Sequence, residues 1–397
     1  MPRRVCTFAV AHTDISAQPF NNAARTVRIL APNNLVGDGI YVKFSNYYSS
    51  RPVWVGNATV ALADRKGNLL AGTIRPLTVC GDTSFALVPE RDVYSDRVSL
   101  SVRPGQTIAV SLYYPLSDKV SSGNFVSTFA TRSVKGDYCA QEVLPKARLL
   151  SGLSRTMLPW DLTNAVTTLS EIVVEQDDDS PIPCVVAAFG DSIMQQGAWV
   201  TPFTQRLYRA CPGMASVCNL GIGGNRLLYD SPSLVKGIYG HAGVERFRYD
   251  LLPVEGLTHA IFALGTNDIG LPGKDGAPES ELITLEQYQD AVKPLVEVLH
   301  RRGVKVYAGK LLPREINHIY TSEREQLRLM INDWLETCGL FDAVLDLGAP
   351  IAATDGPGMK KEFSLPDGLH PNKLGGMAIA QNIDLRLFLS HPGGGKD

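Results

Sequence analysis

The sequence predicts two domains of different fold class. Residues 1–178 are predicted to form an antiparallel β-sandwich of jelly-roll type, and residues 179–397 an α/β domain with a parallel five-stranded sheet flanked by helices. Three observations support this division. A length of 397 residues exceeds that of one ordinary domain. Short segments rich in β-branched and aromatic residues recur up to residue 175, and strands alternate with helices after residue 183.

The N-terminal half consists of short strand-like segments separated by turn-forming clusters such as Pro32-Asn33-Asn34 and Arg103-Pro104-Gly105. Several short strands at this spacing are typical of an antiparallel sandwich. The stretch MPRRVCTFAVAH is interpreted as a first strand and not as a signal peptide, because its apolar run is short and no clear processing site follows. The further predicted strands lie at residues 26–31, 39–45, 53–63, 84–89, 97–102 and 107–115.

The polar stretch EQDDDSPIP, residues 175–183, ends this pattern. Two later helices carry sequence signals for a capping box, at Thr284 with Gln287 and at Ser322 with Glu325, and Gly339 is expected to end the second. Strands that alternate with helices indicate a mainly parallel sheet covered on both faces. The strands are predicted at residues 184–190, 216–222, 259–265, 305–313 and 342–347.

The composition excludes several classes of protein. A net charge of -2, with 44% hydrophobic and 20% charged residues, favours neither nucleic acid nor an anionic membrane surface as partner. No apolar run approaches the ~20 residues of a membrane-spanning helix. The seven cysteines and the histidines show no metal-ligand spacing, so reduced thiols and a cytoplasmic location are expected. Homo-oligomerisation is left open.

Polar residues follow four of the predicted strands of the α/β domain. The patches are Gly190-Asp191-Ser192, the segment from Asn219 to Asn225, Gly265-Thr266-Asn267-Asp268, and the segment from Asp367 to Asn372, where Pro371 is expected to begin a helix. In open α/β sheets, ligand sites form beyond the carboxyl ends of the strands. We therefore expect the four patches to meet at one edge of the sheet.

Together these patches supply what acyl transfer requires. A serine hydroxyl such as that of Ser192 is a weak nucleophile until an imidazole accepts its proton. His370 is suited to this role, and Asp367, three residues earlier, is suited to hold the other ring nitrogen. Backbone N–H groups of the glycine-rich second patch and the amide of Asn267 are candidate donors for an oxyanion.

Each patch taken alone has a simpler interpretation. Gly190-Asp191-Ser192 is a common turn, Asn267-Asp268 fits an Asx-turn, and GIGGN (221–225) suggests a phosphate loop, although the lysine of a P-loop is absent. The ordered combination of the four favours a hydrolase. Asp191 and Asp268 are expected to stabilise site loops by hydrogen bonding, and three apolar residues at helical spacing are expected in the core: Trp199, Phe203 and Leu207.

The blocks GDS, GIGGN, GTND and DGLHP resemble, in that order, those of the SGNH (GDSL-like) hydrolase family. The resemblance covers the C-terminal half, and it extends more loosely to two-domain esterases with an N-terminal β-domain. It implies a flavodoxin-like sheet and five catalytic residues: Ser192 as nucleophile and oxyanion donor, Gly224 and Asn267 as further donors, and Asp367 with His370 as the base. Where the family has GDSIT, this chain has Met194 in place of the threonine.

The resemblance implies a serine carboxylester hydrolase that forms an acyl-enzyme and needs no metal or organic cofactor. Acetyl or other short-chain esters, including O-acetylated oligosaccharides, are the expected substrates. A lysophospholipase or thioesterase acting on longer chains is the alternative. A carbohydrate-binding protein without catalytic activity is a third hypothesis.

Overall fold

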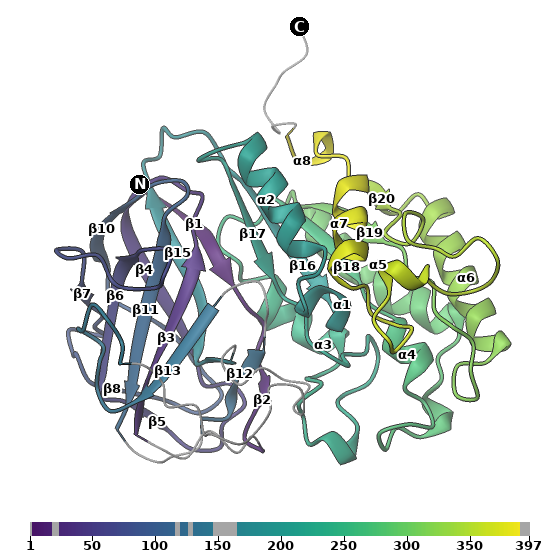
Figure 1. Cartoon of the computed structure of the whole chain (residues 1–397), viewed down its shortest axis with the longest axis horizontal. Coiled ribbons are helices and arrows are strands. Elements are labelled where there is room, and N and C mark those ends of the chain that lie inside the picture. Colours follow the sequence, from purple (N-terminus) through teal and green to yellow (C-terminus); the bar gives the residue numbers. More distant parts are fainter. Residues whose placement is uncertain (1, 18–23, 116–119, 126–129, 146–164, 390–397) are drawn as a thin grey trace, which may run out of the picture. The chain divides into compact units, whose positions relative to one another are not determined.

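The computed structural model describes residues 2–17, 24–115, 120–125, 130–145 and 165–389, which Figure 1 shows as coloured ribbons. The chain divides into two compact units. The first comprises Met1–Pro181 with Pro212–Met214, and the second Ile182–Cys211 with Ala215–Asp397. The domains predicted from the sequence, 1–178 and 179–397, stay a prediction, and both include residues outside this description.

The first unit consists of antiparallel sheets. One sheet has the order β1-β15-β4-β10 with β9 paired to β4, another the order β13-β3-β11-β6-β7, and β14-β12-β2 and β5-β8 form two smaller sheets. No helix occurs among the described residues of this unit. The predicted antiparallel β-region is confirmed, whereas its jelly-roll connectivity stays a prediction. The strands are β1 (Arg3–Ala9), β2 (Thr13–Asp14), β3 (Arg25–Pro32), β4 (Gly37–Ser45), β5 (Val53–Val55), β6 (Asn57–Ala63), β7 (Arg75–Pro76), β8 (Phe85–Leu87), β9 (Asp92–Tyr94), β10 (Val98–Val102), β11 (Thr107–Tyr114), β12 (Ser122–Phe125), β13 (Ala130–Lys135), β14 (Ala165–Thr167) and β15 (Leu169–Gln176).

This unit differs from the sequence prediction in one strand that is divided and in several strands that were not predicted. The predicted strand 53–63 is interrupted at Gly56, so that β5 pairs with β8 while β6 pairs with β11. The strand β15 was not predicted, although it is the neighbour of both β1 and β4. The glutamates of β15 explain why the sequence did not predict it, since Glu is depleted in strands. In the structure, Glu171 and Glu175 accept hydrogen bonds from the hydroxyls of Tyr94 and Tyr41, which compensates for their place inside a sheet.

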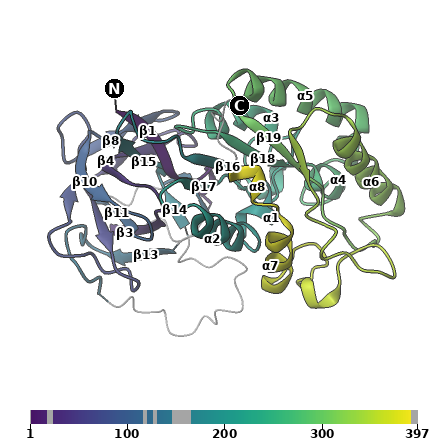
Figure 2. The same cartoon turned by 90° about the horizontal axis from the view of Figure 1, so that it is seen from above.

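The second unit is built on a parallel sheet with the strand order β17-β16-β18-β19-β20. Figure 2 shows α2 and α7 on one face of this sheet and α3 and α5 on the other. The predicted five-stranded parallel sheet with helices on both faces is thereby confirmed. The elements are β16 (Cys184–Gly190), α1 (Ser192–Gln195), α2 (Val200–Ala210), β17 (Ala215–Asn219), η1 (Ser233–Val235), α3 (Gly243–Arg246), η2 (Phe247–Leu251), β18 (His259–Ala263), α4 (Thr266–Gly270), η3 (Glu279–Glu281), α5 (Leu285–Arg301), β19 (Lys305–Gly309), α6 (Ser322–Thr337), β20 (Ala343–Leu345), η4 (Lys361–Phe363), α7 (Lys373–Asn382) and α8 (Arg386–Leu389).

The core on the α2 and α7 face contains the three apolar residues that the sequence assigned to it. Trp199, Phe203 and Leu207 are all fully buried in one cluster with side chains of the sheet and of α7. Phe203 and Phe388 pack edge to face with ring centroids 5.1 Å apart. Among the described residues, no helix combines the length and apolar character needed to span a membrane.

The helix starts follow the sequence signals only in part. The capping box of Thr284 and Gln287 at α5 is confirmed, with hydrogen bonds of 3.2 and 2.8 Å. The one predicted at Ser322 is wrong, because Ser322 is already the first helical residue and Glu325 binds Arg328 instead. The start of α7 at Pro371 is also wrong, since the helix begins after Asn372, whose side chain accepts the N–H groups of Leu374 and Gly375.

Close packing of α7 against the segment before α2 yields a prediction about stability. A Cβ at Gly376 would overlap the carbonyl group of Ala198. We expect Gly376→Ala to destabilise the protein by about 1–3 kcal/mol, because backbone atoms would have to move apart. Gly356→Ala, where a Cβ would meet no atom within 4 Å, serves as the control. A Gly376→Ala melting temperature equal to that of the control would contradict this packing argument.

Candidate active site

Ser192 lies just beyond the carboxyl end of β16, which is flanked by β17 and β18, on the first turn of α1. Asp191 caps this short helix, and its carboxylate accepts the Ile193 N–H at 3.0 Å. Gly190 is required before the turn, because a Cβ there would lie 2.5 Å from the Met194 sulfur and 2.8 Å from the Ala263 carbonyl oxygen. The serine is 9% exposed. The sharp strand-to-helix turn thus holds a buried serine at the edge of the sheet.

His370 lies within hydrogen-bonding distance of that serine. Its Nε2 is 2.7 Å from Ser192 Oγ, and its Nδ1 is 2.7 Å from Asp367 Oδ2. The second oxygen of Asp367 accepts the N–H groups of Leu369 and His370 at 2.9 and 3.0 Å. The structure therefore brings together the three residues that the sequence assigned to a nucleophile, a base and the group that orients it.

The protonation state of Asp367 determines the imidazole tautomer. Partial burial raises the pKa of Asp367, but hydrogen bonds from the His370 side chain and from two backbone N–H groups outweigh it and hold this pKa well below its ordinary range. An ionised carboxylate only accepts hydrogen bonds, so Nδ1 of His370 carries the proton. Nε2 of neutral His370 is then free to accept the hydroxyl proton of Ser192.

The glycine-rich segment after β17 lies against α1. A Cβ at Gly221 would be 2.9 Å from the Asp191 carbonyl oxygen, so only glycine permits this approach. Gly224 has a φ of +73° and is covered by the ring of Tyr239. Within the described part of the chain, no hydrogen bond occupies the backbone N–H of Gly224 or of Ser192. Both N–H groups are therefore available to a bound group.

Asn267 is the second residue of α4 and is 6% exposed. Its Nδ2 donates to the carbonyl oxygen of Asn225 at 3.0 Å, which ties α4 to the glycine-rich segment. An amide nitrogen carries two hydrogens, so one remains for a further acceptor. Asn267 is thus joined directly to the residue that follows Gly224.

Arg246, which the sequence analysis missed, joins these segments. Its fully buried guanidinium donates to the Gly190 carbonyl at 2.8 Å, the Leu220 carbonyl at 2.9 Å and the Asn225 side chain at 2.7 Å. It also lies 3.9 Å above the ring of Phe189, and it pairs with Asp250 at 3.2 Å. No sequence signal points to it, because two of its acceptors are backbone carbonyls that any residue supplies.

Two buried carboxylates stabilise the surrounding loops, as expected. Asp268 accepts the N–H groups of Leu227 and Leu228 at 2.7 and 3.0 Å. Burial raises the pKa of Asp268, although these two hydrogen bonds lower it in part. Burial likewise raises the pKa of Asp191 to about 6, and the carboxylate of Asp268 adds to this shift. Neither group is bonded to the imidazole of His370.

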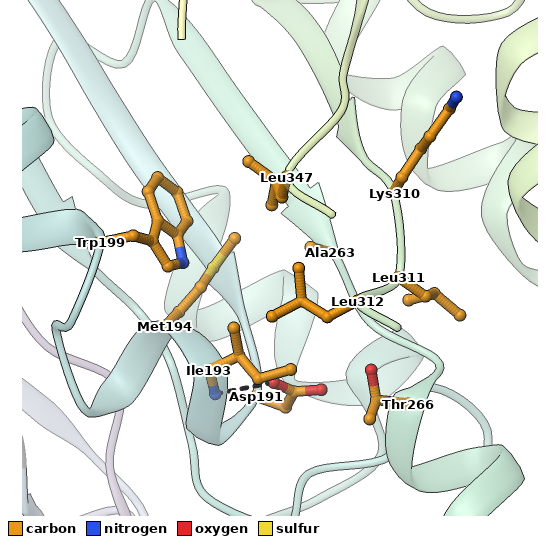
Figure 3. Close-up of a pocket in the computed structure, with 10 residues that line it drawn as sticks. All are labelled: Asp191, Ile193, Met194, Trp199, Ala263, Thr266, Lys310, Leu311, Leu312 and Leu347. Atoms are coloured by element: carbon orange, nitrogen blue, oxygen red, sulfur yellow. Dashed lines mark hydrogen bonds between the residues drawn. The ribbon is translucent and has the colours of Figure 1, made fainter. Parts of the chain in front are cut away.

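One pocket of about 270 Å³, including the open space at its mouth, adjoins the α1 turn. Figure 3 shows that residues on either side of Ser192 line it, together with Thr266. Lys310 also borders this pocket, but its ammonium group binds Glu336 at 2.6 Å and Asp346 at 3.1 Å. The described residues contain no cluster of three or more histidine, cysteine or acidic side chains arranged to hold a metal ion. The remaining lining is mainly apolar: Ile193, Met194, Trp199, Ala263, Leu311, Leu312 and Leu347.

Part of the chain is similar to known proteins. The model of the GDSL-like Lipase/Acylhydrolase family matches residues 188–377. Among solved structures, the chain is similar to the acetylxylan esterase Axe2 from Geobacillus stearothermophilus, with 16% identity and a TM-score of 0.38 over 53% of this chain and 98% of that one. It is also similar to a carbohydrate acetylesterase family member from Sinorhizobium meliloti, with 16% identity and a TM-score of 0.38 over 52% of this chain and 98% of the other. No curated protein matches. At such identities and TM-scores, only the family match bears on classification.

The position of Arg246 yields a second prediction about stability. We expect Arg246→Leu to destabilise the protein by about 3–5 kcal/mol, because the buried acceptors at Gly190, Leu220 and Asn225 would lose their donor and the ion pair with Asp250 would be lost. The matched control is Arg248→Leu, two residues later, whose side chain is 68% exposed and pairs with Glu245. We expect the control to change stability by less than about 1 kcal/mol. Equal shifts of Tm in the two variants would refute this role of Arg246.

The pKa of Asp191 predicts a pH dependence of stability. With a pKa of about 6 in the folded protein against 3.8 ordinarily, the folded state binds the proton more tightly, so stability falls as pH rises between these values. Above pH 6 the cost reaches about 3 kcal/mol. Asn accepts the same Ile193 N–H without charge, so Asp191→Asn is expected to raise Tm at pH 7.5 and to change it little at pH 4. A gain of equal size at both pH values would contradict the burial argument.

Proposed function

We propose that the chain is a carboxylic ester hydrolase, because residues 188–377 match the model of the GDSL-like Lipase/Acylhydrolase family, and that it removes acetyl and other short acyl groups through an acyl-enzyme on Ser192. The observation that carries this proposal is the pair of 2.7 Å contacts that link Ser192, His370 and Asp367. A hydroxyl, an imidazole and a carboxylate in this arrangement activate a serine for attack on a carbonyl carbon.

In the first half of the reaction, Ser192 Oγ attacks the ester carbonyl while His370 Nε2 accepts its proton. The negative charge on the tetrahedral oxygen is bound by the N–H groups of Ser192 and Gly224 and by the free amide hydrogen of Asn267. These donors are held in place before the substrate arrives, so little reorganisation accompanies the developing charge. Protonated His370 then gives its proton to the alcohol oxygen, and the alcohol leaves.

In the second half, water attacks the acyl-enzyme. His370 Nε2 accepts a proton from this water, and the same three donors bind the second tetrahedral oxyanion. The C–O bond to Ser192 breaks, its oxygen recovers the proton from His370, and the carboxylic acid leaves. Asp367 remains ionised in both halves, and it stabilises the imidazolium that forms in each.

The proposal of an acyl group is supported by the pocket beside α1, whose lining is mainly apolar and includes the two neighbours of Ser192, Asp191 and Ile193. O-acetylated oligosaccharides are the proposed natural substrates.

The proposal is tested by replacing the nucleophile. Ser192→Ala is expected to lower ester hydrolysis by about a thousandfold or more and to abolish labelling by a fluorophosphonate, which forms a phosphorus–oxygen bond to an activated serine as fluoride leaves. Ser280→Ala, an exposed serine of η3, is the control and should keep both properties. Residual hydrolysis by Ser192→Ala above about a tenth of the wild-type rate would disprove the mechanism.

The acyl group is tested with a series of p-nitrophenyl esters from acetate to palmitate, together with O-acetylated oligosaccharides. We expect kcat/KM to be highest for acetate and to fall with chain length. A maximum at palmitate would favour the lysophospholipase or thioesterase alternative.

A further inference from the structure

Arg314 has a half-buried guanidinium for which the described residues supply no hydrogen-bond acceptor. It lies in the loop between β19 and α6, and its guanidinium carbon is 4.6 Å from the centre of the Tyr320 ring. No hydrogen bond or ion pair links this guanidinium to any residue that the structure describes. Stacking on an aromatic ring orients the planar group and leaves its donor edges open.

The loop of Arg314 contacts two elements of the catalytic site. A Cβ at Gly270, the last residue of α4, would overlap Nη1 of Arg314, so the guanidinium lies directly on the helix that carries Asn267. The next residue, Glu315, packs on Gly368, with its Oε2 3.2 Å from the position of a Cβ there. Gly368 stands between Asp367 and His370. Arg314 is therefore held next to both the proposed oxyanion donor and the proposed base.

The two nearby arginines of α6 are used differently. Arg324 donates to the carbonyl oxygens of Ile269 and Pro272 at 3.1 and 3.0 Å and pairs with Glu279. Arg328 donates to Glu325 and to the carbonyl oxygen of Leu311. Both are buried, and both stabilise the fold. Because the donors of Arg314 do not stabilise the fold in this way, they remain available to a partner outside the chain.

The carboxylate of Asp367 is the acidic group at the catalytic site that acts on Arg314. Burial lowers the pKa of Arg314, and Asp367 raises it in part. The oxygens of Asp367 are, however, already occupied by His370 and by two backbone N–H groups. An arginine forms two parallel hydrogen bonds with a carboxylate or a phosphate, and few other groups match this geometry.

We propose that Arg314 binds an anionic group, a carboxylate or a phosphate, on the alcohol half of the ester. The inference rests on the proposed function. A short acyl group is too small to carry an anionic substituent, so the anionic group must belong to the alcohol half of the ester. An acetylated sugar acid or sugar phosphate fits this description. Arg314 thereby determines specificity and takes no part in the bond-breaking steps.

The experiment compares three acetate esters of similar shape: 4-acetoxybenzoate, 4-acetoxyphenyl phosphate and the neutral 4-acetoxybenzamide. For each enzyme, the measured quantity is kcat/KM for an anionic ester divided by kcat/KM for the neutral one. Arg314→Gln is expected to lower this ratio by about 10- to 100-fold, the range of a charge-assisted hydrogen bond. Arg314→Lys should give an intermediate ratio, because it keeps the charge but not the paired donors.

The matched control is Arg301→Gln, at the end of α5, whose side chain is 68% exposed and which removes the same charge. It should leave the ratio unchanged. If Arg314→Gln lowers the ratio only for 4-acetoxybenzoate, the bound anion is a carboxylate. If it lowers the ratio only for 4-acetoxyphenyl phosphate, the bound anion is a phosphate. Either result supports the proposal. An Arg314→Gln ratio equal to that of the control overturns the proposed anion site. In that case, continued hydrolysis of the neutral ester would still support the proposed function.

A second measurement uses the unmodified protein and so does not depend on the folding of a variant. Inorganic phosphate and benzoate are expected to inhibit hydrolysis of 4-acetoxybenzamide competitively, more weakly at high ionic strength. Absence of inhibition by both anions would overturn the anion site. If none of the three esters is hydrolysed, the proposed function itself fails.

Discussion

One buried guanidinium holds the catalytic edge of the second unit together. Arg246 binds the carbonyl of Gly190, two residues before the candidate nucleophile, and the side chain of Asn225, one residue after Gly224. Asn225 in turn accepts the amide of Asn267. Three segments that follow different strands are thus connected through two polar side chains. Each connection is buried, so water does not compete for these donors and acceptors.

The three aspartates of this region lie in environments that separate their pKa values. Asp367 is partly exposed, and its hydrogen bonds hold its pKa low, whereas burial raises the pKa of both Asp191 and Asp268. The carboxylate beside the imidazole is therefore the one that keeps its charge over the widest range of pH. Carboxylates of the same chemical type acquire different roles through their surroundings, as is usual in enzyme sites.

The sequence predicted the elements whose signals are local. The strand β16 was predicted with its observed bounds, because an apolar run ends there at a glycine. The four polar patches were recognised as one site because parallel strands end at the same edge of a sheet. Asp367 and His370, three residues apart, were paired correctly for the same local reason.

Features that depend on distant contacts could not be predicted in this way. β15 contains glutamates, which become acceptable in a sheet through hydrogen bonds from Tyr94 and Tyr41 and, for Glu175, through an ion pair with Arg97. Ser322 lost its predicted capping role because Glu325 has a stronger partner in Arg328. Arg246 and Arg314 carry no motif, and their significance lies in which backbone groups and rings surround them.

The separation of the catalytic contacts along the chain has a consequence for the order of folding. Asp367 and His370 are joined by a turn of three residues, whereas Ser192 and His370 are 178 residues apart. Closing so large a loop costs entropy that short-range contacts do not, and non-local contacts form late. The aspartate–histidine pair can assemble locally, but the serine joins it only when the whole parallel sheet has formed. Recovery of activity after denaturation therefore reports the completion of the domain.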